Sequence, residues 1–233
     1  TSLLLQDTLQ MSLQRYVNAL LAIPGAANAR AIYLPSQAEG LTSNAAGGRI
    51  YTHANTPSGR LVRQGDGFGL RFNGTSDIAT TPDANILSFG DGTNDSPFSM
   101  AGVVQIAASA AVRTIIAKWT VTAGREYLLT FNASDGLVFQ MGDESVPVAT
   151  LRTSDAAVPV NRTIFVSGSY TDATGSATAA NDITLYVNGK VVASTATNQA
   201  TYVAMEAGTG VLNIGSIGGG GSFFAGILYM AMV

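Results

Sequence analysis

The segment DITLYVNGKVVAS at residues 182–194 constrains the fold more than any other stretch of this sequence. Apolar residues alternate on both sides of Asn188-Gly189, and a two-residue Asn-Gly loop is typical of a type I′ hairpin turn, because both central residues must accept a positive φ. The predicted cross-strand pairs are Val187 with Lys190, Leu185 with Val192, and Tyr186 with Val191. The residues expected on the core face are Ile183, Leu185, Val187 and Val192, with Tyr186 and Val191 on the other face.

From about residue 31 the rest of the chain has the same character. Short segments rich in Val, Ile, Thr, Phe and Tyr are separated by Gly, Asn, Asp and Ser, and 125–142 forms a second predicted hairpin. Residues 36–66 predict long loops. Strands are predicted near 31–34, 68–72, 77–80, 97–106, 112–119, 126–132, 136–141, 163–170, 182–187, 190–194, 201–204, 210–215 and 223–233. This pattern favours an all-β fold, a two-sheet antiparallel β-sandwich of the jelly-roll type.

The first 23 residues differ from the remainder. Apolar residues at three- and four-residue spacing predict an amphipathic helix that ends at Pro24-Gly25. Its apolar face comprises Leu9, Leu13, Tyr16, Val17, Leu20 and Leu21. Such a helix either packs on its own domain or serves as an arm that docks on a partner chain. We therefore divide the chain into an N-terminal helical arm, 1–30, and a sandwich domain, 31–233.

Composition excludes several classes of protein. Apolar residues make up 46% of the chain and charged residues only 12%, so a large core is expected and disorder is not. The net charge of −3 gives no basic footprint for nucleic acid. The chain has no cysteine, and no apolar run approaches the roughly 20 residues that span a bilayer, so neither a disulfide framework nor a membrane is expected.

Several segments resemble laminin-G-like domains of the concanavalin A-like lectin and glucanase superfamily. They occur in the order of that family and cover about residues 31–233. The segments are GLRFNGTSDIATTP (69–82), SPFSMAGVVQI (96–106), RTIIAKW (113–119), RTIFVSGSYTD (162–172), the ITLYVNGKVVAS hairpin, and the ending VLNIGSIGGGGSFFAGILYMAMV. The resemblance implies a concanavalin A-like sandwich. Gly102 departs from it, since the family often has Trp there, and the usual segment after the final strand is missing.

The sequence gives no catalytic signal. The glucanase branch of the resembling superfamily places paired carboxylates in a Glu-x-Asp-x-x-Glu strand, a spacing that this chain lacks. Asp143 and Glu144 are neighbours, so on a strand they would point to opposite faces. His53 is the only histidine, and no G-x-S-x-G elbow accompanies it. We expect a protein that is not an enzyme.

The loop GDGTNDS (90–96) is the one candidate metal site. Asp91, Asn94 and Asp95 offer hard oxygen ligands suited to Ca²⁺, and some members of the resembling family bind Ca²⁺ in loops at a sandwich edge. The same residues are also ordinary turn formers. No other cofactor is expected.

Three aromatic residues are candidate sugar-stacking groups: Trp119, Tyr127 and Tyr186. Aromatic side chains in β-sheets also fill cores or pair across strands, so their exposure decides between these roles.

Two functions fit these observations. The first is a structural surface protein of a virus particle, such as a phage capsid decoration or a head- or tail-associated protein. The arm would then bind capsid or other virion proteins, and a homo-oligomer, with a trimer as the guess, is expected. The alternative is an extracellular lectin-type module that binds carbohydrate or protein. The localisation is accordingly the virion or the extracellular space.

Overall fold

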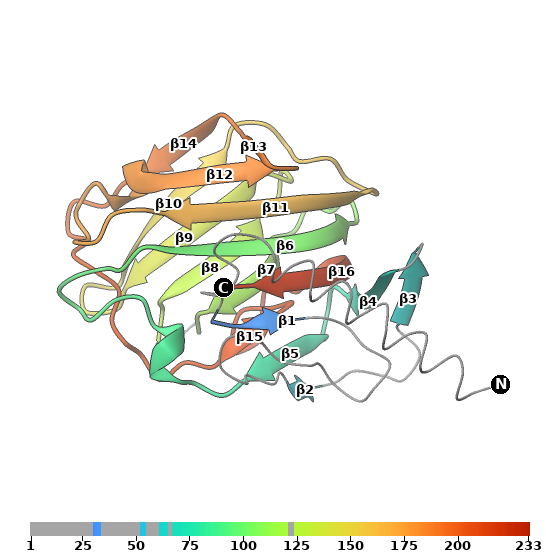
Figure 1. The fold of residues 1–233 in the computed structure, drawn as a ribbon, viewed down its shortest axis with the longest axis horizontal. Coiled ribbons are helices and arrows are strands. Elements are labelled where there is room, and N and C mark those ends of the chain that lie inside the picture. The colour runs from blue at the N-terminus through green and yellow to red at the C-terminus, as the bar shows by residue number, and fades with distance from the viewer. Residues whose placement is uncertain (1–29, 34–51, 55–60, 65–66, 121–123) are drawn as a thin grey trace.

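The described residues of the computed structural model are 30–33, 52–54, 61–64, 67–120 and 124–233, and they form two antiparallel β-sheets packed face to face (Figure 1). The strands of the first sheet, called sheet I here, are β1 (Ile32–Tyr33), β3 (Leu61–Gln64), β4 (Gly67–Asn73), β6 (Phe98–Ile106), β11 (Thr163–Tyr170), β12 (Ile183–Val187), β13 (Lys190–Val191) and β16 (Ala225–Met232). Their order is β13-β12-β11-β6-β16-β4-β3, and β1 pairs with β16.

The strands of the second sheet, sheet II, are β2 (Thr52–Ala54), β5 (Ile78–Thr81), β7 (Arg113–Lys118), β8 (Tyr127–Phe131), β9 (Leu137–Asp143), β10 (Val148–Ser154), β14 (Ser194–Thr197) and β15 (Leu212–Ile214). Their order is β14-β10-β9-β8-β7-β15-β5-β2. Sheet II includes four strands that follow one another along the chain, β7 to β10. The all-β sandwich predicted from the sequence is confirmed.

Helical structure among the described residues is limited to two short 3₁₀ turns, η2 (Asn85–Leu87) and η3 (Ala179–Asp182). No described helix is long and apolar enough to cross a membrane. The predicted N-terminal helix and its apolar residues Leu9, Leu13, Tyr16, Val17 and Leu20 lie outside the described residues.

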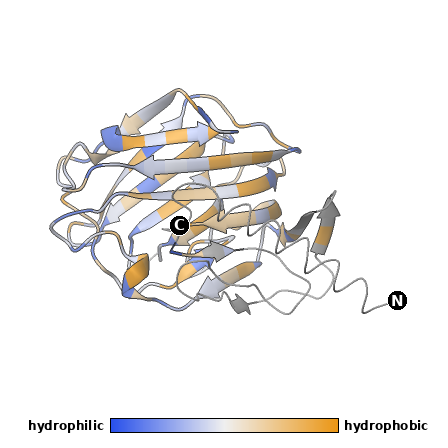
Figure 2. Cartoon of the chain, viewed as in Figure 1, coloured by the Kyte–Doolittle hydropathy of each residue, from blue (hydrophilic) through white to orange (hydrophobic). Residues whose placement is uncertain are grey.

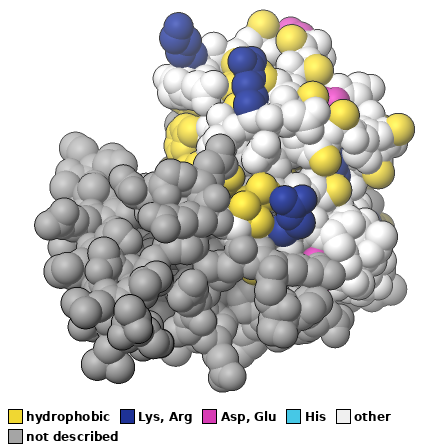
Figure 3. Space-filling view, turned by 90° about the vertical axis from the view of Figure 1, so that its right-hand side faces the viewer, with side chains coloured by type: hydrophobic (Ala, Val, Ile, Leu, Met, Phe, Trp, Pro, Cys, Tyr) yellow, Lys and Arg dark blue, Asp and Glu magenta, His cyan; other side chains and the backbone are white. Residues whose placement is uncertain are grey.

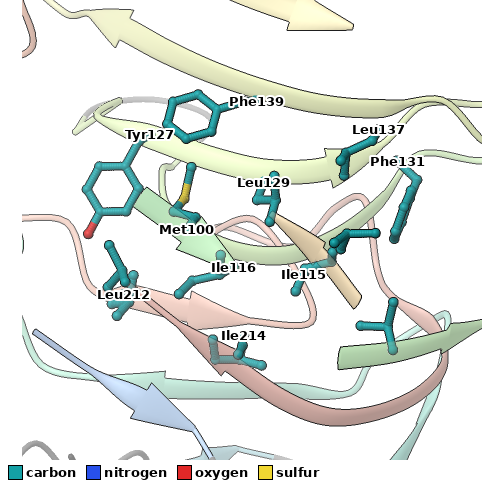
Figure 4. Close-up of a cluster of buried hydrophobic side chains, with 14 of the residues drawn as sticks. Met100, Ile115, Ile116, Tyr127, Leu129, Phe131, Leu137, Phe139, Leu212 and Ile214 are labelled. Carbon is teal, nitrogen blue, oxygen red and sulfur yellow. The ribbon is translucent and has the colours of Figure 1, made fainter. Parts of the chain in front are cut away.

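The core fills the space between the sheets with side chains from alternate strand positions. Figure 2 shows apolar segments along the strands of both sheets, and Figure 4 shows the buried cluster. The Phe98 ring of β6 stacks on Phe89, with ring centroids 4.5 Å apart, and lies within 5.2 Å of the Phe139 ring of β9. Because the aromatic contacts link strands of both sheets, they join the two layers directly.

The β12–β13 hairpin around Asn188-Gly189 has the predicted register. Val187 pairs with Lys190 and Tyr186 with Val191. The φ angles of Asn188 and Gly189 are 50° and 75°, as a type I′ turn requires. Ile183 and Leu185 are buried in the core, whereas Val191 is 66% exposed on the opposite face. The Asn188 side chain adds a bond to the sheet, because its Oδ1 accepts a hydrogen bond from the Phe165 N–H at 3.0 Å.

Four stretches differ from the sequence prediction. The predicted strand 190–194 is divided, since β13 belongs to sheet I and β14 to sheet II. Residues 201–204 form no strand, and β10 was not predicted at all. Short strands β2 and β3 also lie within the span 36–66 that was expected to be loop.

Two glycines on the inner side of sheet I let sheet II approach closely. A Cβ atom on Gly102 would lie 3.0 Å from Ile115 Cγ2, so the Trp that the resembling family often carries there would not fit. A Cβ on Gly168 would overlap the ring of Phe139.

Gly168→Ala should therefore destabilise the fold by about 1–3 kcal/mol, as overpacking of a close-packed core does. Urea denaturation measures the loss. The matched control is Ser169→Ala on the outer face of the same strand, expected within about 0.5 kcal/mol of the wild type. Equal stability of the two variants would contradict the close approach.

Candidate functional site

The three aromatic candidates lie in three different layers. Tyr127 is fully buried between the sheets, where its hydroxyl donates to the Leu87 carbonyl at 2.8 Å. Trp119 is 8% exposed on the outer side of sheet II and packs over Gly142, where a Cβ would lie 2.8 Å from the indole. Tyr186 is partly exposed on the outer side of sheet I. The structure therefore brings no two of them together, and the burial of Tyr127 and Trp119 corrects the expectation that their ring faces stack on a sugar.

The candidate calcium residues lie in one tight turn, in which the Asp91 N–H donates to the Asn94 carbonyl at 3.1 Å, but their side chains do not converge. Asp91 is exposed, and its Oδ1 accepts hydrogen bonds from the N–H groups of Thr93 and Asn94 at 2.8 and 2.7 Å, which makes it the cap of a tight turn. Asp95 is buried and points inward. The described residues include no group of three His, Cys, Asp or Glu side chains that could hold a metal ion. Turn formation and packing account for the positions of Asp91 and Asp95.

The inward carboxylates hold a long segment, residues 198–211, that runs along one end of the sandwich from β14 to β15 (Figure 1). Asp95 accepts from the Met205 N–H at 2.8 Å and from the Tyr202 hydroxyl at 2.7 Å. Asp143 accepts from the Val203 N–H at 2.9 Å. A segment without secondary structure thus obtains acceptors for its buried N–H groups from acidic side chains.

The 198–211 segment also contributes a carboxylate, Glu206, as a hydrogen-bond acceptor. Glu206 accepts from the N–H groups of Glu144 and Ser145 at 2.6 and 2.9 Å, in the turn that joins β9 to β10. The exchange of hydrogen bonds runs in both directions and fastens this turn to the 198–211 segment.

A buried lysine completes this end of the sandwich. Lys118 has no exposed surface, and its Nζ donates to Glu126, to Ser88 Oγ at 2.9 Å and to the Gly208 carbonyl at 2.8 Å. Asp83 lies 3.0 Å from the same ammonium group. A buried charge persists only when it is paired and hydrogen-bonded, and this one is. The acidic residues at this end therefore hold the fold together.

A different surface remains open to a ligand, on the outer side of sheet II. Residues paired directly across antiparallel strands share a face, so the register gives two rows. The first row is Asn213, Ala117, Leu128, Gln140, Leu151 and Thr197. The second row is Thr114, Thr130, Val138, Thr153 and Thr195. These eleven residues, called the uncharged face here, include no charged side chain.

The uncharged face has a closed half and an open half. Over β7, β8 and β15 its side chains are buried, among them Leu128 at 6% exposure and Asn213 at 1%. Over β9, β10 and β14 it reaches solvent: Gln140 and Thr153 are partly exposed, and Thr195 is exposed. The side chains of Gln140 and Thr153 make no hydrogen bond with the described residues. The open half thus offers free polar groups to a ligand.

Sequence reasoning missed this face because β10 and β14 escaped prediction. Their sequences, VATLRTS and STAT, are rich in Thr, Ser and Ala, and they carry no bulky apolar residue at every second position. In β10 neither face carries a regular series of large apolar residues, so the strand is recognised only from its pairing with β9 and β14.

The remaining surface carries few charges. Figure 3 faces one end of the sandwich, and its described part shows basic and acidic side chains standing singly among apolar and uncharged atoms. The outer side of sheet I offers hydroxyl groups as well, from Ser167 beside Tyr186 and from Thr184.

Asp95 gives this end of the sandwich a pH dependence. Burial raises its pKa from 3.8 to about 6, and the charges of Asp172 and Asp143 act in the same direction. The folded protein thus holds this proton more tightly than the unfolded chain, and the free energy of unfolding must fall as pH rises from about 4 to about 6. The whole effect is at most about 3 kcal/mol.

Asp95→Asn should remove this pH dependence of the free energy of unfolding, and the variant should be at least as stable as the wild type at pH 7.5. Asp95→Ala should lose about 1–3 kcal/mol, because the Met205 N–H and the Tyr202 hydroxyl then lack an acceptor. Denaturant titrations between pH 4 and pH 7.5 give both values. Parallel curves for wild type and Asp95→Asn would refute the assignment.

Solved structures share the architecture. The chain resembles the binding domain of botulinum neurotoxin serotype G, with a TM-score of 0.60 and 10% identity over 88% of this chain and 47% of that one. It also resembles the receptor binding domain of botulinum neurotoxin D, with a TM-score of 0.57 and 12% identity over 89% of this chain and 48% of that one. A third similar structure is the binding domain of botulinum neurotoxin DC in complex with SialylT, with a TM-score of 0.52 and 10% identity over 88% of this chain and 47% of that one. The chain spans about half the length of each, and identities this low show the fold alone.

Sequence comparison is more specific. A search of curated proteins finds none that matches. The profile of a laminin-G-like family, described as the concanavalin A-like lectin/glucanases superfamily, matches residues 72–233, which is well over half of the chain. These residues contain most strands of both sheets, including all those of the uncharged face. The chain therefore belongs to the laminin-G-like domains of the concanavalin A-like lectin/glucanases superfamily.

Proposed function

We propose that this chain is a carbohydrate-binding module and that the open half of the uncharged face is its binding surface. The observation that carries the proposal is the register of β9, β10 and β14, which aligns Gln140, Thr153 and Thr197 on one solvent-facing patch. Binding is also the role named for the structural relatives, which are binding domains.

The chemistry of the patch suits a sugar. Hydroxyl and amide groups both donate and accept hydrogen bonds, as sugar hydroxyls do. Leu151 lies between Gln140 and Thr197 in the first row and offers an apolar contact to the C–H groups of a sugar ring. A few placed polar groups around an apolar surface are the usual composition of a ligand site.

We propose further that the module binds without cleaving. Glycosidases flank the scissile bond with two carboxyl groups, roughly 5 to 9.5 Å apart. The uncharged face contains no carboxylate among its described residues, and the buried acids Asp95, Asp143 and Glu126 are engaged by the 198–211 segment.

The setting in which the module works is a separate proposal. We propose that it sits on the surface of a virus particle, attached through its N-terminal residues. Two sequence features support this: the apolar periodicity of residues 2–23, and a surface with few charges, which suits contact with neighbours in an assembly. A homo-oligomer is proposed on the same grounds.

Removal of two polar groups tests the binding proposal. Thr153→Val and Gln140→Ala should each weaken binding to the tightest oligosaccharide of a glycan array about tenfold, because each removes one hydrogen bond worth about 1–1.5 kcal/mol. Calorimetric titration gives the affinities. The controls Ser167→Ala and Thr184→Val make the same kind of change on the outer face of sheet I. Loss of binding in the controls alone would place the site on sheet I.

Deletion of residues 1–23 tests the attachment proposal. The truncated chain should keep its thermal unfolding midpoint and its glycan affinity but lose self-association, measured by light scattering. A truncated chain that forms the same oligomer as the full chain would contradict the role of the arm.

A further inference from the structure

A carboxylate lies at the rim of the open half of the uncharged face, next to Thr195. Asp155 follows β10 directly and is exposed. Its N–H donates to the Ala193 carbonyl at 3.0 Å, and its Oδ1 accepts from the Thr195 hydroxyl at 2.7 Å. Thr195 is the last residue of the second row, so the charge of Asp155 is fixed beside the proposed binding surface.

The three strands under the open half, β9, β10 and β14, carry no basic side chain on this face. Arg152 is the nearest basic residue along β10, but it pairs with Phe139 and so points to the inner side of the sheet. Its guanidinium donates to Ser194 Oγ at 2.7 Å and to the carbonyls of Ala180 and Asn181 at 3.2 Å. The open half itself therefore carries uncharged groups with Asp155 at one rim, whereas Arg125 and Glu144 lie at the other edge of the face, beside Gly142.

We propose that Asp155 makes this face selective for uncharged glycans over acidic ones, such as those that end in sialic or uronic acid. The inference rests on the proposed function and names the ligand class of the same site. A sugar carboxylate close to Thr195 would meet the like charge of Asp155 and would find no arginine or lysine of β9, β10 or β14 on this face to pair with. A neutral sugar meets no such penalty, and the free oxygen of Asp155 can accept a hydrogen bond from a sugar hydroxyl.

The expected size of the discrimination follows from Coulomb's law. Two like charges about 6 Å apart lower affinity about threefold in bulk water, and about tenfold or more where the local dielectric is lower. Salt at about 0.5 M screens such an exposed pair almost completely. The preference should therefore be strong at low ionic strength and weak at high ionic strength.

Matched pairs of oligosaccharides provide the test. Each pair consists of a neutral oligosaccharide and the same molecule with a terminal sialic acid, lactose and sialyllactose among them, and the full-length protein is titrated with both at 20 mM and 500 mM NaCl. We expect the neutral member to bind at least threefold more tightly at low salt, with the difference shrinking at high salt.

The variant Asp155→Asn keeps the acceptor for the Thr195 hydroxyl and removes the charge. It should raise affinity for the acidic member about three- to tenfold at low salt and leave the neutral member within twofold. Asp91→Asn, an exposed carboxylate at the opposite end of the sandwich, is the control and should change neither affinity. Wild-type protein that prefers the acidic member, or Asp155→Asn that leaves the ratio unchanged, overturns the inference while the binding proposal stands. Absence of binding to every glycan overturns both.

Discussion

The contact between the Phe139 ring of β9 and the bare backbone of Gly168 in β11 is the constraint on which the rest of the structure depends. It sets the distance between the sheets, and it fixes which side of β9 faces inward. Because side chains alternate along a strand, Phe139 inside places Val138 and Gln140 outside. A shift of one residue would turn the core side chains to solvent, so the core determines the register and the register determines the outer surface.

The outer surface of sheet II is therefore a consequence of the core. The strands β8 and β9 give their largest residues to the interior, as Leu129 and Phe139 show, and the outward positions of the sheet carry threonine, glutamine and aliphatic residues. The antiparallel pairing of β7, β8, β9, β10 and β14 is by itself enough to align these residues in two rows. The strands on which the family fold relies thus also carry the surface to which we assign binding.

Acidic residues serve two distinct purposes in this molecule. At one end of the sandwich, buried carboxylates accept hydrogen bonds from the irregular 198–211 segment, and Lys118 compensates part of their charge. Burial raises the pKa of both Asp95 and Glu126, so the ionisation of these two groups lowers the free energy of unfolding as the pH rises toward neutrality. Asp155, by contrast, is exposed beside the uncharged face, where its charge acts on a ligand.

The sequence predicted those features that depend on local chemistry. The Asn188-Gly189 turn requires positive φ, so the hairpin register and its core face followed directly, and the family resemblance placed the sandwich. The sequence did not predict which aromatic rings are covered, because Trp119 and Tyr127 lie on strands whose faces only the complete sheet order assigns. Nor did it predict β10 and β14, whose Thr- and Ser-rich sequences lack the apolar alternation of a strand with one buried face.

The most direct test of the central claim is a map of the bound surface by ¹H–¹⁵N NMR, with the tightest neutral oligosaccharide of the array added to the full-length protein. The account predicts shift changes concentrated at Gln140, Leu151, Thr153 and Thr195 on the outer side of sheet II. Changes confined to β11 and β12 of sheet I, or to the end of the sandwich at residues 198–211, would contradict it.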